Sequence, residues 1–174
     1  VELESRWGKI DGIVHSIAFA NGDDLKGRFS KTTRDGFKLA LDVSAYSLIA
    51  VAGRAEKLMS QGGSIITMSY LRAQRTVTNY NVMGVAKAAL EASVRYLAVD
   101  LGEKGIRVNA VSAGPIKTLA AAGIPGFRDL LSTFAERAPL KRNVALEDVA
   151  RTGLFYLSDM SSVITGETTF VDCG

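Results

Sequence analysis

Short apolar runs alternate with long helical patterns along this chain, and that alternation constrains its fold more than any other feature. The runs are continuous rather than alternating between apolar and polar residues. Such runs are typical of strands in a parallel sheet that is buried on both faces. They occupy residues 11–17, 64–69, 106–112 and 168–171.

Helical patterns fill the connections between these runs. In the first of them, Phe37, Leu41, Ala45, Leu48 and Ala52 recur at spacings of three and four, which favours an amphipathic helix. Right-handed crossovers through such helices predict an α/β fold, a Rossmann-like doubly wound parallel sheet. The expected helices span residues 32–59, 79–102, 127–135 and 146–158.

Composition excludes several classes of protein. The chain has 174 residues, of which 47% are hydrophobic and 22% charged, and this suits a single domain over residues 1–174. Its longest charge-free stretch, residues 58–71, is too short for a membrane span of roughly 20 residues. One histidine and one cysteine cannot form a zinc cage, so no metal is expected. Basic residues are scattered and no reading motif is visible, so no nucleic-acid partner is expected.

Ligands of such sheets bind beyond the carboxyl ends of the strands, which directs attention to residues 16–21, 69–79 and 113–118. Tyr80 and Lys87 follow the second of these segments. A spacing of seven residues advances about 700° along a helix, so both side chains project from one face. A nearby ammonium favours the phenolate, so the pair is predicted to act as a proton donor tuned toward neutral pH. The alternative is an amphipathic surface pair.

The neighbouring strand ends favour the functional interpretation. Tyr70 lies just past the run SIITMS, at the same edge. The segment SAGPIKT, residues 112–118, has a Gly-Pro turn that can expose backbone amides to a cofactor. The segment HSIAFA, residues 15–20, has small residues that let a flat ligand approach the backbone.

The stretch from Ser69 to Ala121 resembles the NADH-dependent enoyl-acyl-carrier-protein reductases of bacteria and plastids, a divergent branch of the short-chain dehydrogenase/reductase superfamily. HSIAFA, DGFKLALDVSAYS, AAAGIPGF, LEDVA and TGE are similar as well. Ordinary members of the superfamily place Tyr and Lys four apart, with a Ser thirteen residues before the Tyr. Here Met83 and Tyr70 occupy those two positions, and this departure favours enoyl reduction over ketone reduction.

The resemblance implies that the trans-2-enoyl thioester of acyl carrier protein is reduced by NADH, with NADPH not excluded. Tyr80 would stabilise the developing oxyanion, Lys87 would hold the nicotinamide ribose, and Tyr70 would complete the catalytic set. A substrate-binding lid is expected over residues about 118–136. The implied cofactor-binding residues are Ser16, Ile17, Ala18, Lys87, Ile116, Thr118 and Ala120. The implied substrate-binding residues are Ala20, Tyr70, Tyr80, Met83, Ala121, Ile124 and Phe127.

Further expectations concern partners and the extent of the chain. By resemblance the protein is a homotetramer in the bacterial cytoplasm or the plastid stroma. The basic residues after the lid either steer an acidic carrier protein or form an ordinary solvated rim. These residues are Arg128, Arg137, Lys141 and Arg142. No glycine-rich turn precedes the first strand, so we expect the chain to lack an N-terminal strand–turn–helix unit.

Two other functions stay open. One is a 3-ketoacyl or other carbonyl reductase of the same superfamily, and the other is a catalytically silent fragment or binding module. Outside the site, His15 is predicted to be a packed or cofactor-edge residue because it has no visible nucleophile or metal partner. Cys173 is predicted to be a small buried residue.

Overall fold

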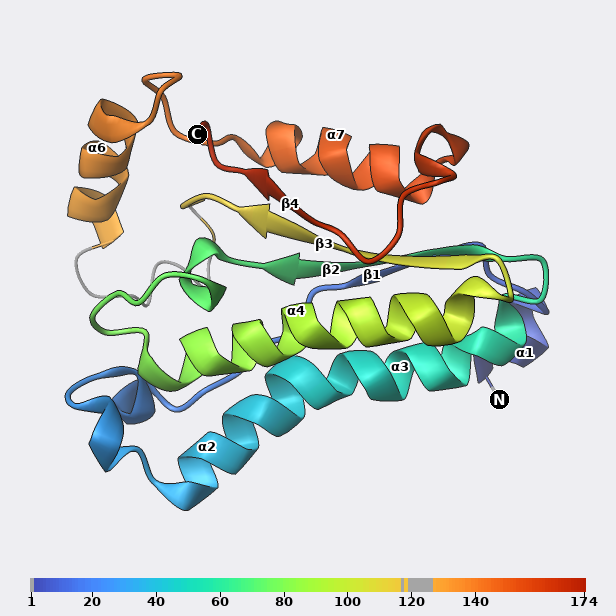
Figure 1. Cartoon of the computed structure of the whole chain (residues 1–174), viewed down its shortest axis with the longest axis horizontal. Helices are drawn as coiled ribbons and strands as arrows, with labels where there is room; N and C mark the ends of the chain where they lie inside the picture. Colours follow the sequence, from blue (N-terminus) through green and yellow to red (C-terminus); the bar gives the residue numbers. More distant parts are fainter. Residues whose placement is uncertain (1, 117, 119–126) are drawn as a thin grey trace.

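Four parallel strands form the centre of the molecule (Figure 1). The structure, a computed structural model, describes residues 2–116, 118 and 127–174, and for residues 127–130 only the backbone is considered. The strand order β1-β2-β3-β4 follows the chain, which confirms the parallel sheet expected from the continuous apolar runs. The strands are β1 (Gly12–His15), β2 (Gly63–Ser69), β3 (Ile106–Ala113) and β4 (Thr168–Val171).

Helices cover both faces of the sheet (Figure 1). On one face lie α4 (Asn81–Gly102) and the run formed by α2 (Arg34–Leu41) and α3 (Ser47–Ala55). On the other face lies α7 (Leu146–Leu157). Helices on both faces of a parallel sheet confirm the doubly wound, Rossmann-like layout. The remaining helical segments are α1 (Glu2–Trp7), α6 (Phe127–Arg137) and short turns at Gly22–Leu25, Phe29–Lys31, Glu56–Leu58, Leu71–Ala73 (η5) and Asp159–Ser161.

The core lies on both sides of the sheet. Leu48, Leu90 and Val108 are fully buried between the α3/α4 layer and the strands. On the opposite face, Ile66 and Tyr156 pack in a second cluster under α7. Each fully buried apolar side chain contributes about 1.5–3 kcal/mol relative to exposure, so these two layers hold the carboxyl ends of the strands in register.

The α2–α3 run is not the single regular helix that the spacing predicts. It begins at Thr33, whose Oγ1 accepts the Gly36 N–H at 3.0 Å, and this is a normal helix cap. A π-helical turn, Asp42–Tyr46, then separates α2 from α3. Such turns widen a helix locally and are frequent at functional sites. Here the turn carries Ser44, which contacts the segment after β1.

The helical run from Arg34 to Leu58 is long and apolar enough to cross a membrane by length and composition alone, although it contains charged residues. Three of its alanine and leucine side chains, Ala40, Leu48 and Ala52, are fully buried against the rest of the chain. Core helices meet the same length and composition test, so this feature is weak evidence for a span.

Candidate active site

A cleft of about 400 Å³ opens where β1, β2 and β3 end. Parallel strands present their carboxyl ends at one edge, which is where sheets of this kind bind ligands. The lining brings together six of the residues singled out in the sequence, and they come from four separate segments. These six are Ser16, Tyr70, Tyr80, Lys87, Ile116 and Thr118.

Lys87 reaches the cleft from within the buried face of α4. It is 7% exposed, and its Nζ donates a hydrogen bond to the carbonyl oxygen of Met68 at 2.6 Å. Burial lowers the pKa of Lys87 to about 8, and the nearby Glu91 carboxylate partly opposes that shift. An ammonium has three donors, and Lys87 makes one hydrogen bond among the described residues. The remaining donors suit hydroxyl oxygens of a ligand in the cleft.

Tyr80, Tyr70 and Arg72 form a compact group beside Lys87. The two tyrosine rings meet edge to face with their centroids 5.5 Å apart. The Arg72 guanidinium carbon lies 5.4 Å from the Tyr70 centroid and 5.0 Å from that of Tyr80, within range of a cation–π contact. Each ring therefore restricts the other, and the arginine fixes both.

The predicted tuning of the Tyr80 phenol toward neutral pH is wrong. Burial, and then the adjacent Tyr70, raises the pKa of Tyr80 to about 12, while Arg72 opposes the shift. Lys87 is not among the causes of this shift, and its Nζ donates to the Met68 carbonyl. Tyr80 therefore stays protonated through the neutral range and can act as a hydrogen-bond donor.

The start of α4 explains how Tyr80 reaches the cleft. Tyr80 is the N-cap residue of the helix, and the preceding Asn79 has a φ of 61°, a left-handed conformation that asparagine tolerates. Asn81 Nδ2 donates to the carbonyl oxygens of Lys26 and Gly27 at 3.0 and 2.9 Å. These bonds tie the helix start to the loop after β1.

His15 is a packed residue, as predicted. It is 2% exposed, its Nδ1 lies 2.9 Å from Thr67 Oγ1, and its Nε2 lies 2.9 Å from Ser47 Oγ. Burial lowers the pKa of His15, and the positive charge of Lys87 lowers it further. The neutral imidazole thus links β1, β2 and α3, and its chain neighbour Ser16 lines the cleft.

Ser44 holds the segment that follows β1. Its Oγ accepts the Phe19 N–H at 2.9 Å and donates to the Phe19 carbonyl at 3.1 Å. Ser44 is fully buried in the π-helical turn, whereas Phe19 is 51% exposed. One hydroxyl therefore satisfies both backbone groups of a residue in the predicted cofactor-binding segment.

The other predicted site residues lie elsewhere. Ile17 and Ala18 are exposed beyond β1. Ala20 and Met83 pack in the apolar cluster between α2 and α4, and Met83 is only 7% exposed. None of these four is part of the described lining of the cleft. Ala120, Ala121, Ile124 and the side chain of Phe127 lie outside the described residues.

Sequence reasoning overlooked three residues of this region: Arg72, Ser44 and Glu91. Arg72 follows Tyr70 by two residues at a strand end, which was a readable signal. Glu91 falls on the buried face of its helix, four residues after Lys87. A charged residue at a core-facing position is unusual, so the sequence contained a signal for Glu91 as well. The sequence contained no signal for Ser44, because the π-helical turn that orients this residue breaks the regular helical spacing.

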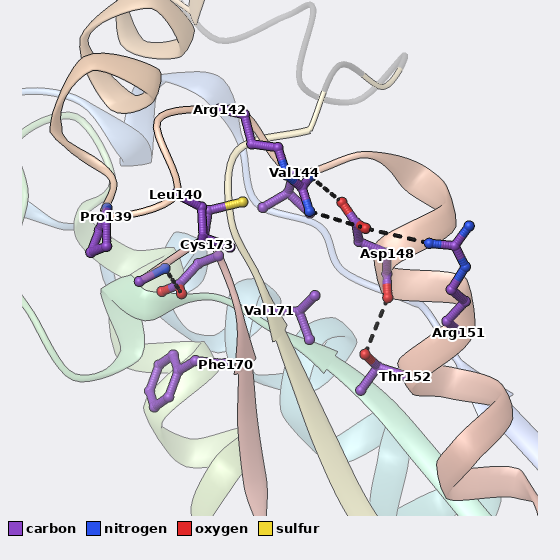
Figure 2. Close-up of a pocket in the computed structure, with 12 residues that line it drawn as sticks. Pro139, Leu140, Arg142, Val144, Asp148, Arg151, Thr152, Phe170, Val171 and Cys173 are labelled. Carbon is purple, nitrogen blue, oxygen red and sulfur yellow. Dashed lines mark hydrogen bonds and ion pairs between the residues drawn. The ribbon is translucent and has the colours of Figure 1, made fainter.

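A second cleft, of about 660 Å³, lies between the start of α7 and the end of β4 (Figure 2). Arg142 Nη1 and Asp148 Oδ2 form an ion pair at 2.6 Å in this cleft, and Arg151 approaches the same carboxylate at 3.8 Å (Figure 2). Cys173 lines it and is partly exposed, so its prediction as a buried residue is wrong. In the described part of the chain, no three or more His, Cys, Asp or Glu side chains are grouped to hold a metal.

The parallel sheet, its two helical layers and the cleft beyond the strand ends define a Rossmann-like fold with a Tyr–Lys cleft. The family model described as "Enoyl-(Acyl carrier protein) reductase" matches residues 1–174. The chain therefore belongs to the enoyl-acyl-carrier-protein reductase family.

Similar proteins are found in several bacteria. The chain is 59% identical over 172 residues to an enoyl-[acyl-carrier-protein] reductase [NADH] of Rhizobium meliloti, covering 99% of this chain and 63% of that protein. It is 60% identical to the [NADPH] enzyme of Staphylococcus aureus, covering 96% of this chain and 65% of that protein. The crystal structure of the Bacillus cereus enzyme with NADP+ and indole naphthyridinone superposes with a TM-score of 0.98 at 55% identity, covering 99% and 67% of the two chains. The chain thus spans about two thirds of the length of these relatives.

Proposed function

We propose that the protein carrying this chain reduces the trans-2-enoyl thioester of acyl carrier protein, with NADH as the reductant. The observation that carries this proposal is the pairing of a protonated phenol, Tyr80, with a buried ammonium, Lys87, in one cleft at the sheet edge. Membership of the family and the names of its relatives support it.

Tyr80 would supply the hydrogen bond that the reaction needs. When bound, the nicotinamide supplies a hydride to the β-carbon of the enoyl thioester, and negative charge develops on the thioester oxygen. The Tyr80 phenol would donate to that oxygen, and a positioned donor of this kind typically accelerates a reaction by about 10²–10³-fold. Arg72, held over the Tyr80 ring, adds positive charge near the same place.

Lys87 would hold the cofactor. Lys87 lines the cleft, and two of its three ammonium donors are not used by the bond to Met68. Each of these two donors can bind one hydroxyl of a ribose, so the residue fits this part of the cofactor. Ser16, Ile116 and Thr118 line the same cleft and would contact the cofactor alongside it. Ile17, Ala18 and Ala120 remain proposed cofactor contacts by resemblance alone. Relatives named for NADH and for NADPH both occur, so either reductant suits the family.

The acyl chain would bind next to the tyrosine pair. Tyr70 lines the cleft and contacts the Tyr80 ring, which suits a role in shaping the acyl site. Residues about 118–136 would form a lid, with α6 as its later part. The remaining proposed substrate contacts are Ala20, Met83, Ala121, Ile124 and Phe127.

Acyl carrier protein is the proposed partner, and the basic rim is one proposed contact surface. Arg142 is paired with Asp148, and Lys141 Nζ donates to the Glu136 carbonyl at 2.9 Å. The ion pair offsets the charge of Arg142, whereas the hydrogen bond to a carbonyl leaves the charge of Lys141 in place. Arg128, Arg137 and Lys141 would therefore carry most of the steering charge. Neutralising all three without a change in KM for the carrier-protein substrate would exclude that role.

Self-association as a homotetramer is proposed for the exposed apolar face of α4 and α3. Tyr96 is 77% exposed and Val99 78% exposed on α4, and Ile49 on α3 is 42% exposed. Large contiguous patches of exposed apolar side chains mark contact surfaces, and this face is proposed to form one. Light scattering on Tyr96→Glu and Val99→Glu variants should show a smaller assembly than the parent. The proposed compartment is the bacterial cytoplasm or the plastid stroma.

Comparing turnover of enoyl and 3-ketoacyl thioesters by the protein that carries this chain tests the activity. Enoyl reduction with little ketone reduction supports the proposal. The reverse result identifies a ketoreductase, and cofactor binding without turnover of either substrate identifies a binding module.

A further inference from the structure

Glu91 is a buried carboxylate that the proposed reaction does not use. It lies on α4 one helical turn after Lys87 and is 5% exposed. Burying a charged group is unfavourable unless polar partners replace water. Glu91 has two such partners, and they come from a different part of the chain.

The two oxygens of Glu91 accept hydrogen bonds from opposite ends of one segment. Ser69 Oγ donates to Oε1 at 2.5 Å, and Gln74 Nε2 donates to Oε2 at 3.1 Å. Ser69 is the last residue of β2, and Gln74 is the C-cap residue of the short 3₁₀ turn η5. One carboxylate therefore bridges both ends of residues 69–74 to the helix that carries Tyr80 and Lys87.

The bridged segment carries the side chains that face Tyr80. Tyr70 meets the Tyr80 ring edge to face, and the Arg72 guanidinium lies over both rings. Only a single turn of hydrogen bonds holds the segment internally, from Ala73 N to Tyr70 O at 2.8 Å and from Gln74 N to Leu71 O at 3.0 Å. Short 3₁₀ turns have poor hydrogen-bond geometry, so tertiary contacts must fix the position of this one.

Close packing leaves little room for the segment to move toward α4. A Cβ added at Gly84 would lie 3.0 Å from the Arg72 carbonyl oxygen, so the backbone of the turn rests directly on the helix. The Glu91 bridge prevents movement in the other direction, away from α4. The two contacts together define one position for the turn.

We propose that Glu91 is a positioning residue whose carboxylate holds residues 69–74 against α4, so that Tyr70 and Arg72 contact the Tyr80 ring. The proposal rests on the proposed function, because Tyr80 is taken as the donor to the thioester oxygen. Displacing Tyr70 and Arg72 would leave Tyr80 in place at the start of its helix but remove the groups that fix its ring. Misplacement of catalytic groups by about 1 Å can cost up to about 100-fold in rate.

The Glu91→Gln variant of the full protein tests the bridge. The neutral amide can keep both contacts only if the Gln74 amide reverses, so that Gln74 accepts instead of donating. Neither contact is then a charge-assisted hydrogen bond, and such bonds are about twice as strong as neutral ones. We expect kcat for an enoyl thioester to fall on the order of tenfold. Glu91 raises the pKa of Lys87, so the Kd of NADH is compared near about pH 6, where the Lys87 ammonium should stay charged in both proteins and the Kd should be unchanged. Hydrogen exchange of the backbone amides of residues 70–76, followed by mass spectrometry, should become faster. Glu103→Gln, the same change at an exposed residue that caps the same helix, should alter neither quantity.

A charge-swapped double variant, Glu91→Gln with Gln74→Glu, provides a rescue. Position 74 is exposed, so a carboxylate is tolerated there, and it can accept from the new amide at position 91. We expect the double variant to recover most of the lost kcat and the slow exchange. Gln74→Ala, which leaves the buried carboxylate intact, should show a smaller effect of the same kind and covers the case in which Glu91→Gln does not fold.

Three results would overturn the proposal: unchanged exchange in Glu91→Gln and Gln74→Ala, an equal loss of NADH affinity and kcat, or no recovery in the swapped variant. Failure of the proposed function is distinguishable, because the parent protein would then reduce no enoyl thioester while the exchange comparison still reports on the bridge.

Discussion

Lys87 donates a hydrogen bond to the carbonyl oxygen of Met68, with 2.6 Å between Nζ and O. This bond connects the first third of α4 to the end of β2, and it fixes the ammonium at the edge of the sheet. The position of the charge is thus a property of the folded chain itself. The consequences for ligand binding can be measured directly.

Replacing Lys87 by methionine should weaken NADH binding by about 10–100-fold, because hydrogen bonds to a charged group are worth about 1.5–3 kcal/mol. The variant keeps the length of the side chain and loses its charge. A fluorescence titration with NADH measures the change. Lys57→Met, at an exposed position near the end of the α2–α3 run, is the matched control. An unchanged Kd in Lys87→Met would remove Lys87 from the cofactor site.

NADH binding should weaken as the pH rises through about 8, because the pKa of Lys87 is lowered to about 8 by burial. Below that pH the ammonium is charged, and above it the amine is neutral. The pKa of His15 is lowered as well, so His15 does not take up a proton in this range. Titrations from pH 7 to 9 should show the loss in the parent protein, whereas Lys87→Met should show a flat profile.

The same shift affects stability with a definite sign. The folded chain releases the Lys87 proton near pH 8, whereas the unfolded chain releases it near 10.5. Between these values the unfolded state binds more protons, so the contribution of Lys87 to the free energy of unfolding rises with pH. Urea unfolding of the parent and of Lys87→Met across this window should show the difference, and a contribution that falls with pH would contradict it.

Tyr80→Phe should lower kcat for enoyl reduction by about 10²–10³-fold, the usual cost of removing one donor to a developing oxyanion. The Kd of NADH should stay constant, since Lys87 makes the cofactor contact. Because the pKa of Tyr80 is raised to about 12, its contribution should not vary between pH 6 and 9. Tyr96→Phe, on the exposed face of the same helix, should have normal kcat.

Ser44→Ala should lower the free energy of unfolding by about 1–3 kcal/mol, because it leaves the N–H and the carbonyl of Phe19 without their protein partner. Urea unfolding measures this cost. Ser93→Ala, whose hydroxyl only supplements a helical carbonyl on α4, should change stability by much less. Equal effects in the two variants would show that Ser44 does not hold the segment after β1.

Asp148 should stabilise the start of α7 down to strongly acidic pH. Its carboxylate accepts from Arg142 and from the Ala145 N–H at 3.0 Å, and these contacts lower its pKa to about 2. A depressed pKa means that the contribution is present above about pH 4 and is lost as the pH falls through about 2. The melting temperature of Asp148→Asn should vary less than that of the parent across this window, whereas Glu147→Gln should behave like the parent.

The alternation of apolar runs and helical patterns was sufficient to predict the parallel sheet and the edge at which the cleft forms. The predicted strand ends were less accurate. The apolar run covers residues 11–17, but β1 covers only Gly12–His15, because a strand ends where its hydrogen bonds to the neighbouring strand end. The spacing of Tyr80 and Lys87 correctly placed both in one cleft. It gave the wrong direction for the Tyr80 pKa, because helical spacing says nothing about burial or about the ring that packs alongside.

By itself, the sequence determined the fold class and the family of this protein, since periodicity and local motifs are properties of neighbouring residues along the chain. Only the tertiary structure decided which groups surround the reactive side chains. The partners of Lys87, Glu91 and Ser44 are 19, 22 and 25 residues away in the chain. Contacts over such separations depend on how the helices pack on the sheet, and that packing sets the charge, the hydrogen bonds and the pKa values of the site.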